Sequence, residues 1–219
     1  MAATIPAVIN ANRVDSEKER ALRNGLFSLI RPHSAVLEVG FGSAAAGKGA
    51  NLDYYPSDIN LTAMDIAFTD DDTGWERIVR AAYRKRKIDL SITRGSVENM
   101  SPQFEDGLFD VVTSSLLLCS VNNPAKALTE IARVLKRGGL YLSVEHILSE
   151  SNINLRSQQK LLNPLQVVIA DNCHLDRETD KLFKSVDTAF NVVDMKYVTL
   201  GSRYPISRQI YTVLGKITA

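Results

Sequence analysis

An acidic residue and two alternating glycines follow a short apolar run near residue 40. The run and the turn after it read Val36-Leu37-Glu38-Val39-Gly40-Phe41-Gly42. An apolar segment that ends in a glycine-rich turn predicts a buried strand passing directly into a bend. Glycine permits the bend and lets a ligand lie against the main chain. Ligands of open α/β sheets bind at the carboxyl ends of strands, so we expect a cofactor site here.

The residues after Gly42 nearly form a phosphate-binding loop. Positions 42–49 read Gly-Ser-Ala-Ala-Ala-Gly-Lys-Gly and match the P-loop pattern except at Gly49, where a Ser or Thr would hold magnesium. Glu38 also stands beside the presumed phosphate position, where a carboxylate disfavours polyphosphate and favours a cationic ligand. A nucleotide-binding P-loop protein and a purely structural turn remain the alternatives.

Asp65 ends the next apolar run, Leu61-Thr62-Ala63-Met64. A carboxylate at this place commonly accepts hydrogen bonds from the ribose hydroxyls of an adenosine-containing cofactor. An ordinary helix cap is the alternative role. We include the neighbouring Ile66 in the cofactor site. Ser96 and Val97 follow the third strand, where a loop can offer a backbone N–H and a polar side chain to an adenine edge; alone, such a segment is more often just a loop.

Two histidines and two cysteines complete the residues that could do chemistry. His146 closes the fifth strand, and His174 adjoins Cys173 in the tail. Each histidine could accept a proton near neutral pH, with a hydrogen-bonded structural role as the alternative. Cys119 and Cys173 form no CxxC pair, so their spacing predicts neither a disulfide framework nor a zinc site. Cys119 is expected to be a buried small side chain rather than a nucleophile.

Alternating strands and helices are predicted to position these residues. Expected strands cover 35–39, 61–65, 90–93, 110–115 and 140–145, and expected helices cover 15–30, 75–85 and 124–135. Gly138-Gly139 is expected to stop the helix at 124–135. This order predicts a doubly wound, mostly parallel sheet with helices on both faces. Expected helices at 152–170 and 176–186 precede expected strands at 190–200 and 208–215. The last two strands predict an antiparallel pair added to the parallel sheet.

One domain is expected over residues 1–219, with 1–32 as an N-terminal helical lid and 147–188 as a helical insert on the substrate side. The insert carries Leu161, Leu162, Leu165, Val168 and Ile169, which could line an acceptor site or pack into the core.

The composition is that of an ordinary globular protein. The chain is 45% hydrophobic and 23% charged, with a net charge of +1. This charge gives no reason to expect nucleic acid or an acidic membrane as a partner. The longest apolar stretch is too short to span a bilayer, and residues 1–10 lack the features of a secretory signal. A cytoplasmic location is therefore expected, and two cysteines without a framework fit a reducing compartment.

Together these motifs resemble those of the class I S-adenosylmethionine (SAM)-dependent methyltransferases. The resemblance rests on Glu38-x-Gly40-x-Gly42, Asp65, Asp110-Val111-Val112 and Arg133-Val134-Leu135-Lys136-Arg137-Gly138-Gly139. A narrower resemblance is to the methyltransferase-like group that includes animal thiol S-methyltransferases. It rests on Leu118-Cys119-Ser120-Val121, Glu145-His146, Asn172-Cys173-His174-Leu175 and residues 49–56. Ala44 to Lys48 form an insertion relative to the family, so Gly49 is expected to be the third glycine.

The resemblance implies a seven-stranded Rossmann-like fold and SAM as the cofactor, with S-adenosylhomocysteine as the product. It implies a small-molecule acceptor, most favourably a thiol sulfur. Nitrogen or oxygen acceptors, including phospholipid amines, and a non-catalytic SAM-binding subunit are the alternatives. The animal relatives carry a membrane anchor that is not expected here.

Specific residues take roles by this resemblance. His146 and His174 are the candidate proton acceptors, and no metal ligand is expected. The expected cofactor-binding residues are Glu38, Gly40, Gly42, Gly49, Asp65, Ile66, Ser96, Val97, Leu118 and Cys119.

Overall fold

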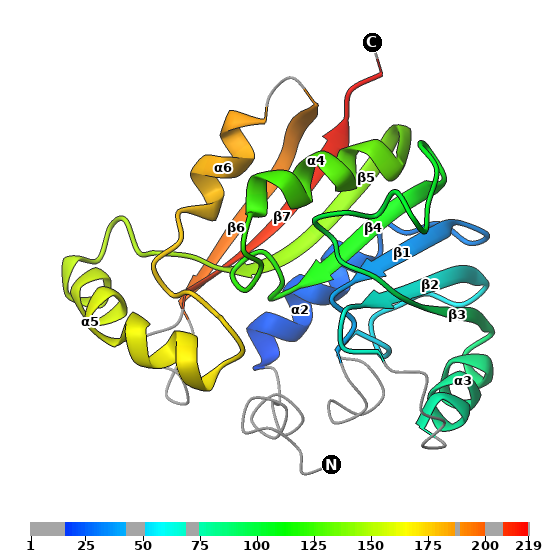
Figure 1. Ribbon diagram of the computed structural model, residues 1–219, viewed down its shortest axis with the longest axis horizontal. Coiled ribbons are helices and arrows are strands. Elements are labelled where there is room, and N and C mark those ends of the chain that lie inside the picture. Colours follow the sequence, from blue (N-terminus) through cyan, green and yellow to red (C-terminus); the bar gives the residue numbers. More distant parts are fainter. Residues whose placement is uncertain (1–15, 43–50, 69–74, 187–188, 200–207, 219) are drawn as a thin grey trace.

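The computed structural model describes residues 16–42, 51–68, 75–186, 189–199 and 208–218. Within these ranges seven strands form one sheet in the order β3-β2-β1-β4-β5-β7-β6 (Figure 1). The strands are β1 (Ala35–Val39), β2 (Ile59–Asp65), β3 (Ile88–Arg94), β4 (Phe109–Ser115), β5 (Leu135–His146), β6 (Phe190–Thr199) and β7 (Arg208–Lys216). Strands β1 to β5 pair in parallel, and β7 pairs antiparallel with both β5 and β6. The predicted fold class is confirmed.

The helices lie close to their predicted positions. They are α2 (Glu17–Phe27), α3 (Trp75–Lys85), α4 (Pro124–Val134), α5 (Ile153–Ile169) and α6 (Thr179–Ser185). Helix α2 begins directly after a reciprocal cap, in which the Ser16 side chain accepts from the Glu19 N–H and the Glu19 carboxylate accepts from the Ser16 N–H. Helix α4 starts at a proline after Asn123, whose side chain accepts from the Lys126 N–H.

The predicted boundary between the helix at 124–135 and the strand at 140–145 was wrong. Helix α4 ends at Val134, and β5 begins at once, because Leu135 is already extended and pairs with Phe109. Gly139 does not stop the helix. A Cβ on Gly139 would lie 2.9 Å from the Asp110 carbonyl oxygen, so glycine there lets β5 pass close to β4.

Two apolar layers cover the two faces of the sheet. Alternate residues of β1 and β4 point to opposite sides, as the strand period requires. One layer includes Phe27 of α2 and Tyr83 of α3, and the other includes Ile131 of α4 and Phe183 of α6. Figure 1 shows α4 and α6 on the near face of the sheet. Helices on both faces, as predicted, therefore bury the central strands.

Two residues of the family motifs are structural and lie at the amino ends of the strands. The Asp110 carboxylate accepts from the Ala35 N–H at 2.8 Å and from the Lys136 ammonium at 2.7 Å. These bonds tie β4 to the starts of β1 and β5. Arg133 pairs with Asp106 at 2.8 Å on the connection into β4. Neither residue reaches the opposite edge, where the parallel strands end.

The loops after β1, β2, β4 and β5 lie together at that opposite edge, and α5 lies beyond it (Figure 1). The apolar residues of α5 do not pack into the core: Leu161 and Val168 are each 79% exposed, and Leu165 is 57% exposed. The core alternative for this apolar group is therefore wrong. Among the described helices, none has the length and apolar content needed to cross a bilayer.

Candidate active site

The turn after β1 has the left-handed backbone conformation that its glycines predict. Gly40 has φ +73° and Gly42 has φ +94°. The Gly40 N–H donates to the Met64 carbonyl at 2.9 Å, which ties the turn to β2. A Cβ on Gly40 would lie 2.8 Å from the Leu117 side chain. The main chain at Gly40 therefore packs against the loop that follows β4. Gly49 and the insertion at 44–48 lie outside the described residues.

Asp65 joins the end of β2 to this turn. One carboxylate oxygen accepts from the Gly42 N–H at 2.8 Å, and the other accepts from the Ala67 N–H at 2.8 Å. A carboxylate has acceptor positions for about four hydrogen bonds, so two bonds leave capacity for a ligand. The neighbouring Ile66 is 66% exposed, so its side chain is free to cover a ligand at this edge.

Glu38 lies buried beneath the glycine turn, with 2% of its surface exposed. Its carboxylate accepts from the Asn51 amide at 2.7 Å and from the Tyr55 hydroxyl at 3.0 Å. Arg23 of α2 extends the network, donating to the Asn51 carbonyl oxygen at 2.8 Å and to the Ser115 hydroxyl at 3.0 Å. Burial raises the pKa of Glu38 to about 7, against the opposing effect of the Asn51 and Tyr55 hydrogen bonds.

Arg23, Asn51 and Tyr55 were not among the predicted site residues. Asn51 and Tyr55 do fall in the 49–56 segment that carries part of the family resemblance, so a signal was present. Their roles were hidden because both side chains turn inward to a carboxylate on β1. Arg23 gave no signal, since one arginine on an amphipathic helix is normally solvated.

The loop after β3 reaches the same edge. The Gly95 N–H donates to the Asp65 carbonyl at 3.2 Å, which places Ser96 and Val97 next to the end of β2. The Ser96 hydroxyl accepts from the Glu98 N–H at 3.3 Å. Val97 is only 5% exposed, and its side chain packs in the core layer, which anchors this loop.

A second buried carboxylate, Glu145 of β5, organises the loop after β4. Glu145 has no exposed surface. It accepts from the Leu117 N–H and the Cys119 N–H, each at 3.2 Å, and from the Ser114 hydroxyl at 3.1 Å. Burial raises its pKa, while the backbone donors act in the opposite direction. Leu118 and Cys119 are both fully buried in this loop.

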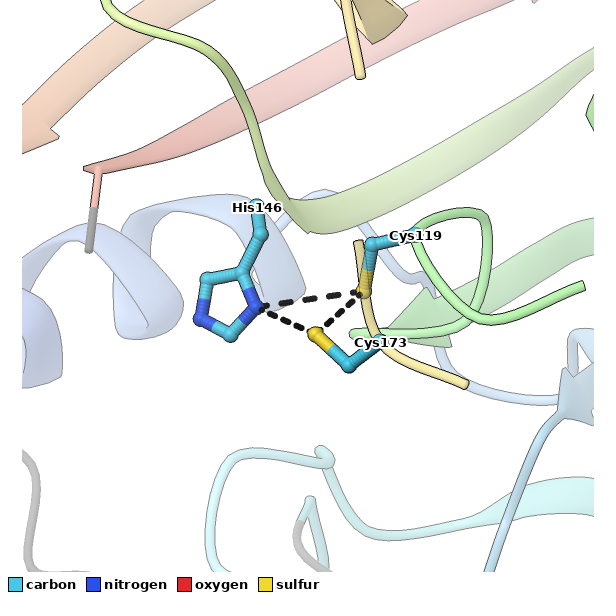
Figure 2. Close-up of side chains that lie close together, drawn as sticks. All are labelled: Cys119, His146 and Cys173. Carbon is cyan, nitrogen blue, oxygen red and sulfur yellow. Dashed lines mark hydrogen bonds between the residues drawn. The ribbon is translucent and has the colours of Figure 1, made fainter. Parts of the chain in front are cut away.

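Both predicted proton acceptors contact Cys119. His146 Nδ1 is 3.1 Å from the Cys173 sulfur and 3.9 Å from the Cys119 sulfur, and the two sulfurs are 3.5 Å apart (Figure 2). The main-chain N–H of His174 donates to the Cys119 carbonyl at 2.8 Å. Burial lowers the pKa of His174, and the charge of Arg177 acts in the same direction. His146, His174 and Cys119 were each named as site residues from the sequence, but Cys173 and this cluster were not.

Comparisons with known proteins place the chain in a family. A methyltransferase domain model matches residues 37–143. Thiol S-methyltransferase TMT1B of Rattus norvegicus is 32% identical over 186 residues, covering 83% of this chain and 72% of the relative. Thiol S-methyltransferase TMT1A of Homo sapiens is 31% identical over 174 residues, covering 78% and 67%. The crystal structure of a SAM-dependent methyltransferase from Methanosarcina mazei superposes with a TM-score of 0.63 at 17% identity, covering 88% of this chain and 96% of that one.

The domain model and the curated relatives, together with the shared fold, identify a SAM-dependent methyltransferase, which confirms the predicted enzyme class and cofactor. The chain belongs to the class I SAM-dependent methyltransferases, in the group that includes the thiol S-methyltransferases just described.

A substitution at Gly40 tests the close approach of the turn to Leu117. Gly40→Ala is expected to destabilise the fold by about 1–2 kcal/mol or more, because a Cβ is disfavoured at positive φ and meets Leu117. Gly25→Ala in α2 is the matched control, since its Cβ would meet nothing within 4 Å. That change is expected to stabilise by roughly 0.5–1 kcal/mol. Equal effects of the two changes in urea unfolding would contradict this account.

The burial of Glu38 predicts a pH dependence of stability. The raised pKa, about 7 against 4.5 in the unfolded chain, means that ionisation in the folded state costs free energy. The stability of the wild type relative to Glu38→Gln should therefore fall as pH rises from about 4.5 to about 7, by up to roughly 3 kcal/mol at 1.36 kcal/mol per unit. Urea titrations of both proteins between pH 5 and 8 measure this difference in the free energy of unfolding. A constant difference would show that Glu38 ionises freely when folded.

Proposed function

We propose that this methyltransferase transfers the SAM methyl group to the sulfur of a small thiol. The observation that carries the proposal is the extent of the similarity to thiol S-methyltransferases. An alignment that covers 83% of 219 residues leaves about 37 uncovered, so it includes 38–182 wherever it begins. It therefore extends past the general methyltransferase domain at 37–143 into the segment of Cys173 and His174.

The chemistry of a thiol suits a site built for positioning. SAM is a sulfonium that supplies the reactive methyl group, and the protein supplies orientation and electrostatics. A free thiol has a pKa of about 8.5, so a few per cent is thiolate at neutral pH, and the positive cofactor increases that fraction. The thiolate must lie roughly 3–3.5 Å from the methyl carbon, opposite the departing sulfur.

In this proposal, different residues of the site bind different parts of the cofactor. Asp65 accepts from the ribose hydroxyls with the oxygen capacity that Gly42 and Ala67 leave unused. Ile66 covers the adenine from its exposed position. Gly40 and Gly42 let the main chain approach the amino-acid end of SAM, and Glu38 favours its positive charge from below.

Six further residues have predicted roles. Val97 offers its main chain to adenine, beside Ser96. Leu118 and Cys119 support the methyl-group end from beneath, since both side chains are buried. His146 and His174 are the predicted proton acceptors.

The acceptor approaches from the side of the insert at 147–188 and the N-terminal helix. Helix α5 of the insert exposes Leu161, Leu165 and Val168, and it lies beyond the carboxyl ends of the strands (Figure 1). Exposed apolar side chains there favour an apolar thiol over a charged one.

Asp65→Asn is expected to weaken SAM binding by tenfold or more, because an amide replaces the charged acceptor of the ribose hydroxyls, a loss of about 1.5–3 kcal/mol. Asp58→Asn is the matched control. Asp58 is exposed at the opposite end of β2. The Asp58→Asn variant should bind SAM with a dissociation constant within about twofold of the wild-type value in calorimetry. Unchanged affinity in Asp65→Asn would remove Asp65 from the site.

A substrate panel tests the acceptor atom. The full chain is incubated with SAM and with a thiol, an alcohol and an amine that share one apolar carbon skeleton, and S-adenosylhomocysteine formation is followed. We expect the thiol to exceed the other two in kcat/KM by about a hundredfold or more. Faster turnover of the amine or the alcohol would overturn the proposal while leaving the enzyme class intact.

A further inference from the structure

Three soft ligand atoms meet beside the proposed cofactor site. Cys119 lies in the loop after β4, His146 at the end of β5, and Cys173 in the connection between α5 and α6 (Figure 2). Their ligand atoms all lie within 4.8 Å of one another, with both cysteines buried and His146 half-buried. Leu117, two residues before Cys119, packs against the glycine turn, so the cluster borders the place where SAM is proposed to bind.

The separations fit the edges of a tetrahedron around one zinc ion. Zinc lies about 2.3 Å from thiolate sulfur and about 2.0–2.1 Å from imidazole nitrogen, so tetrahedral angles put two sulfurs about 3.8 Å apart and sulfur and nitrogen about 3.5 Å apart. The corresponding distances here are 3.5 Å between the sulfurs, and 3.1 and 3.9 Å from nitrogen to sulfur. Shifts of a few tenths of an ångström in the two sulfurs and the nitrogen would let all three coordinate one ion.

The cluster does not have the geometry of a covalent link. A disulfide needs sulfurs about 2.05 Å apart, whereas both cysteines here are free thiols at 3.5 Å. Thiolate and imidazole are the ligands that zinc prefers in proteins.

Contacts that do not involve the thiols hold the ligands together. The His174 N–H donates to the Cys119 carbonyl at 2.8 Å, and the Asn172 amide donates to the Ser120 carbonyl at 2.5 Å. The Arg177 guanidinium donates to the Leu118 carbonyl. The segment with Cys173 is therefore docked on the loop with Cys119 independently of their sulfurs. Such support outside the ligands themselves orients a metal site before the ion arrives.

Three ligands leave one position of a tetrahedron for a donor from outside. In the described part of the chain, no fourth His, Cys, Asp or Glu joins the group. Structural zinc sites have four protein ligands, whereas sites with three, including Cys2His, give the fourth position to water or substrate. Two thiolates and a neutral imidazole would make the zinc site neutral overall, which suits its burial.

We propose that Cys119, His146 and Cys173 bind one zinc ion whose fourth position takes the acceptor thiol as a thiolate. The part concerning the acceptor rests on the proposed function. When the thiol binds, its S–H bond breaks, the proton goes to solvent and a zinc–sulfur bond forms. That sulfur then attacks the SAM methyl carbon, the bond from carbon to the sulfonium sulfur breaks, and the thioether product leaves the zinc as a weak ligand. His146 acts here as a ligand instead of a proton acceptor.

Metal content and Co(II) spectroscopy on the reduced full chain test the site without any turnover. We expect one equivalent of zinc per chain, and Co(II) in its place should give thiolate charge-transfer bands and the intense d–d bands of tetrahedral coordination. Cys119→Ser, Cys173→Ser and His146→Asn should each weaken Co(II) binding by about a hundredfold or more. His33→Asn is the matched control, because this exposed histidine precedes β1 and is far in sequence from the three cluster residues. The variant should bind Co(II) as the wild type does.

Three results would overturn the proposal: reduced wild-type chain that takes up no zinc or Co(II), metal uptake that all three variants retain, or a Co(II) spectrum that does not change when 2-mercaptoethanol is added. Circular dichroism of each variant separates ligand loss from unfolding. The panel of thiol, alcohol and amine acceptors tests the proposed function independently of the metal measurements. Thiol turnover by metal-free protein would refute the zinc site and leave the proposed function standing, whereas a thiol-sensitive Co(II) site in an enzyme that methylates only the amine would refute the function.

Discussion

Two carboxylates buried in the sheet set the shape of this site. Glu38 on β1 and Glu145 on β5 lie on the two strands that flank β4. Burying a carboxylate is costly unless hydrogen-bond donors surround it. Glu38 obtains its donors from Asn51 and Tyr55, and Glu145 obtains its own from Ser114 and the main chain of the loop after β4. The segments that satisfy the two acids are thus the ones that follow β1 and β4, where we propose that the cofactor binds.

This arrangement links the site to the rest of the fold. Arg23 brings α2 to the Asn51 side of the Glu38 network, so the N-terminal helix is fixed at the same edge as the glycine turn. On the other side, Glu145 fixes the main chain at Cys119, and Arg177 and His174 dock the tail on that loop. The methyltransferase sheet therefore has a second set of contacts, from α2 and from the tail, at the edge where its parallel strands end.

The sequence was a good guide wherever the signal was local. Apolar runs that end at Val39, Asp65 and Ser115 predicted three strands and their carboxyl ends, and Gly40 and Gly42 have the positive φ that a glycine turn requires. Local signals failed where neighbours in space decide. Gly139 serves the close passage of β4, which a helix-stop interpretation cannot anticipate. His146 lies 27 residues from each cysteine, and the cysteines are 54 residues apart, so only the tertiary fold brings the three together.

In the proposed function, the acceptor atom that attacks the SAM methyl group is sulfur, rather than nitrogen or oxygen. The most direct measurement gives the enzyme one apolar acceptor that carries a thiol and an amine on the same skeleton, together with SAM labelled in its methyl group. Both groups then reach the site with equal affinity for the skeleton, and the position of the label reports the chemistry alone. We predict label on sulfur, as the thioether, with the amine unmodified. Label on nitrogen would contradict the account.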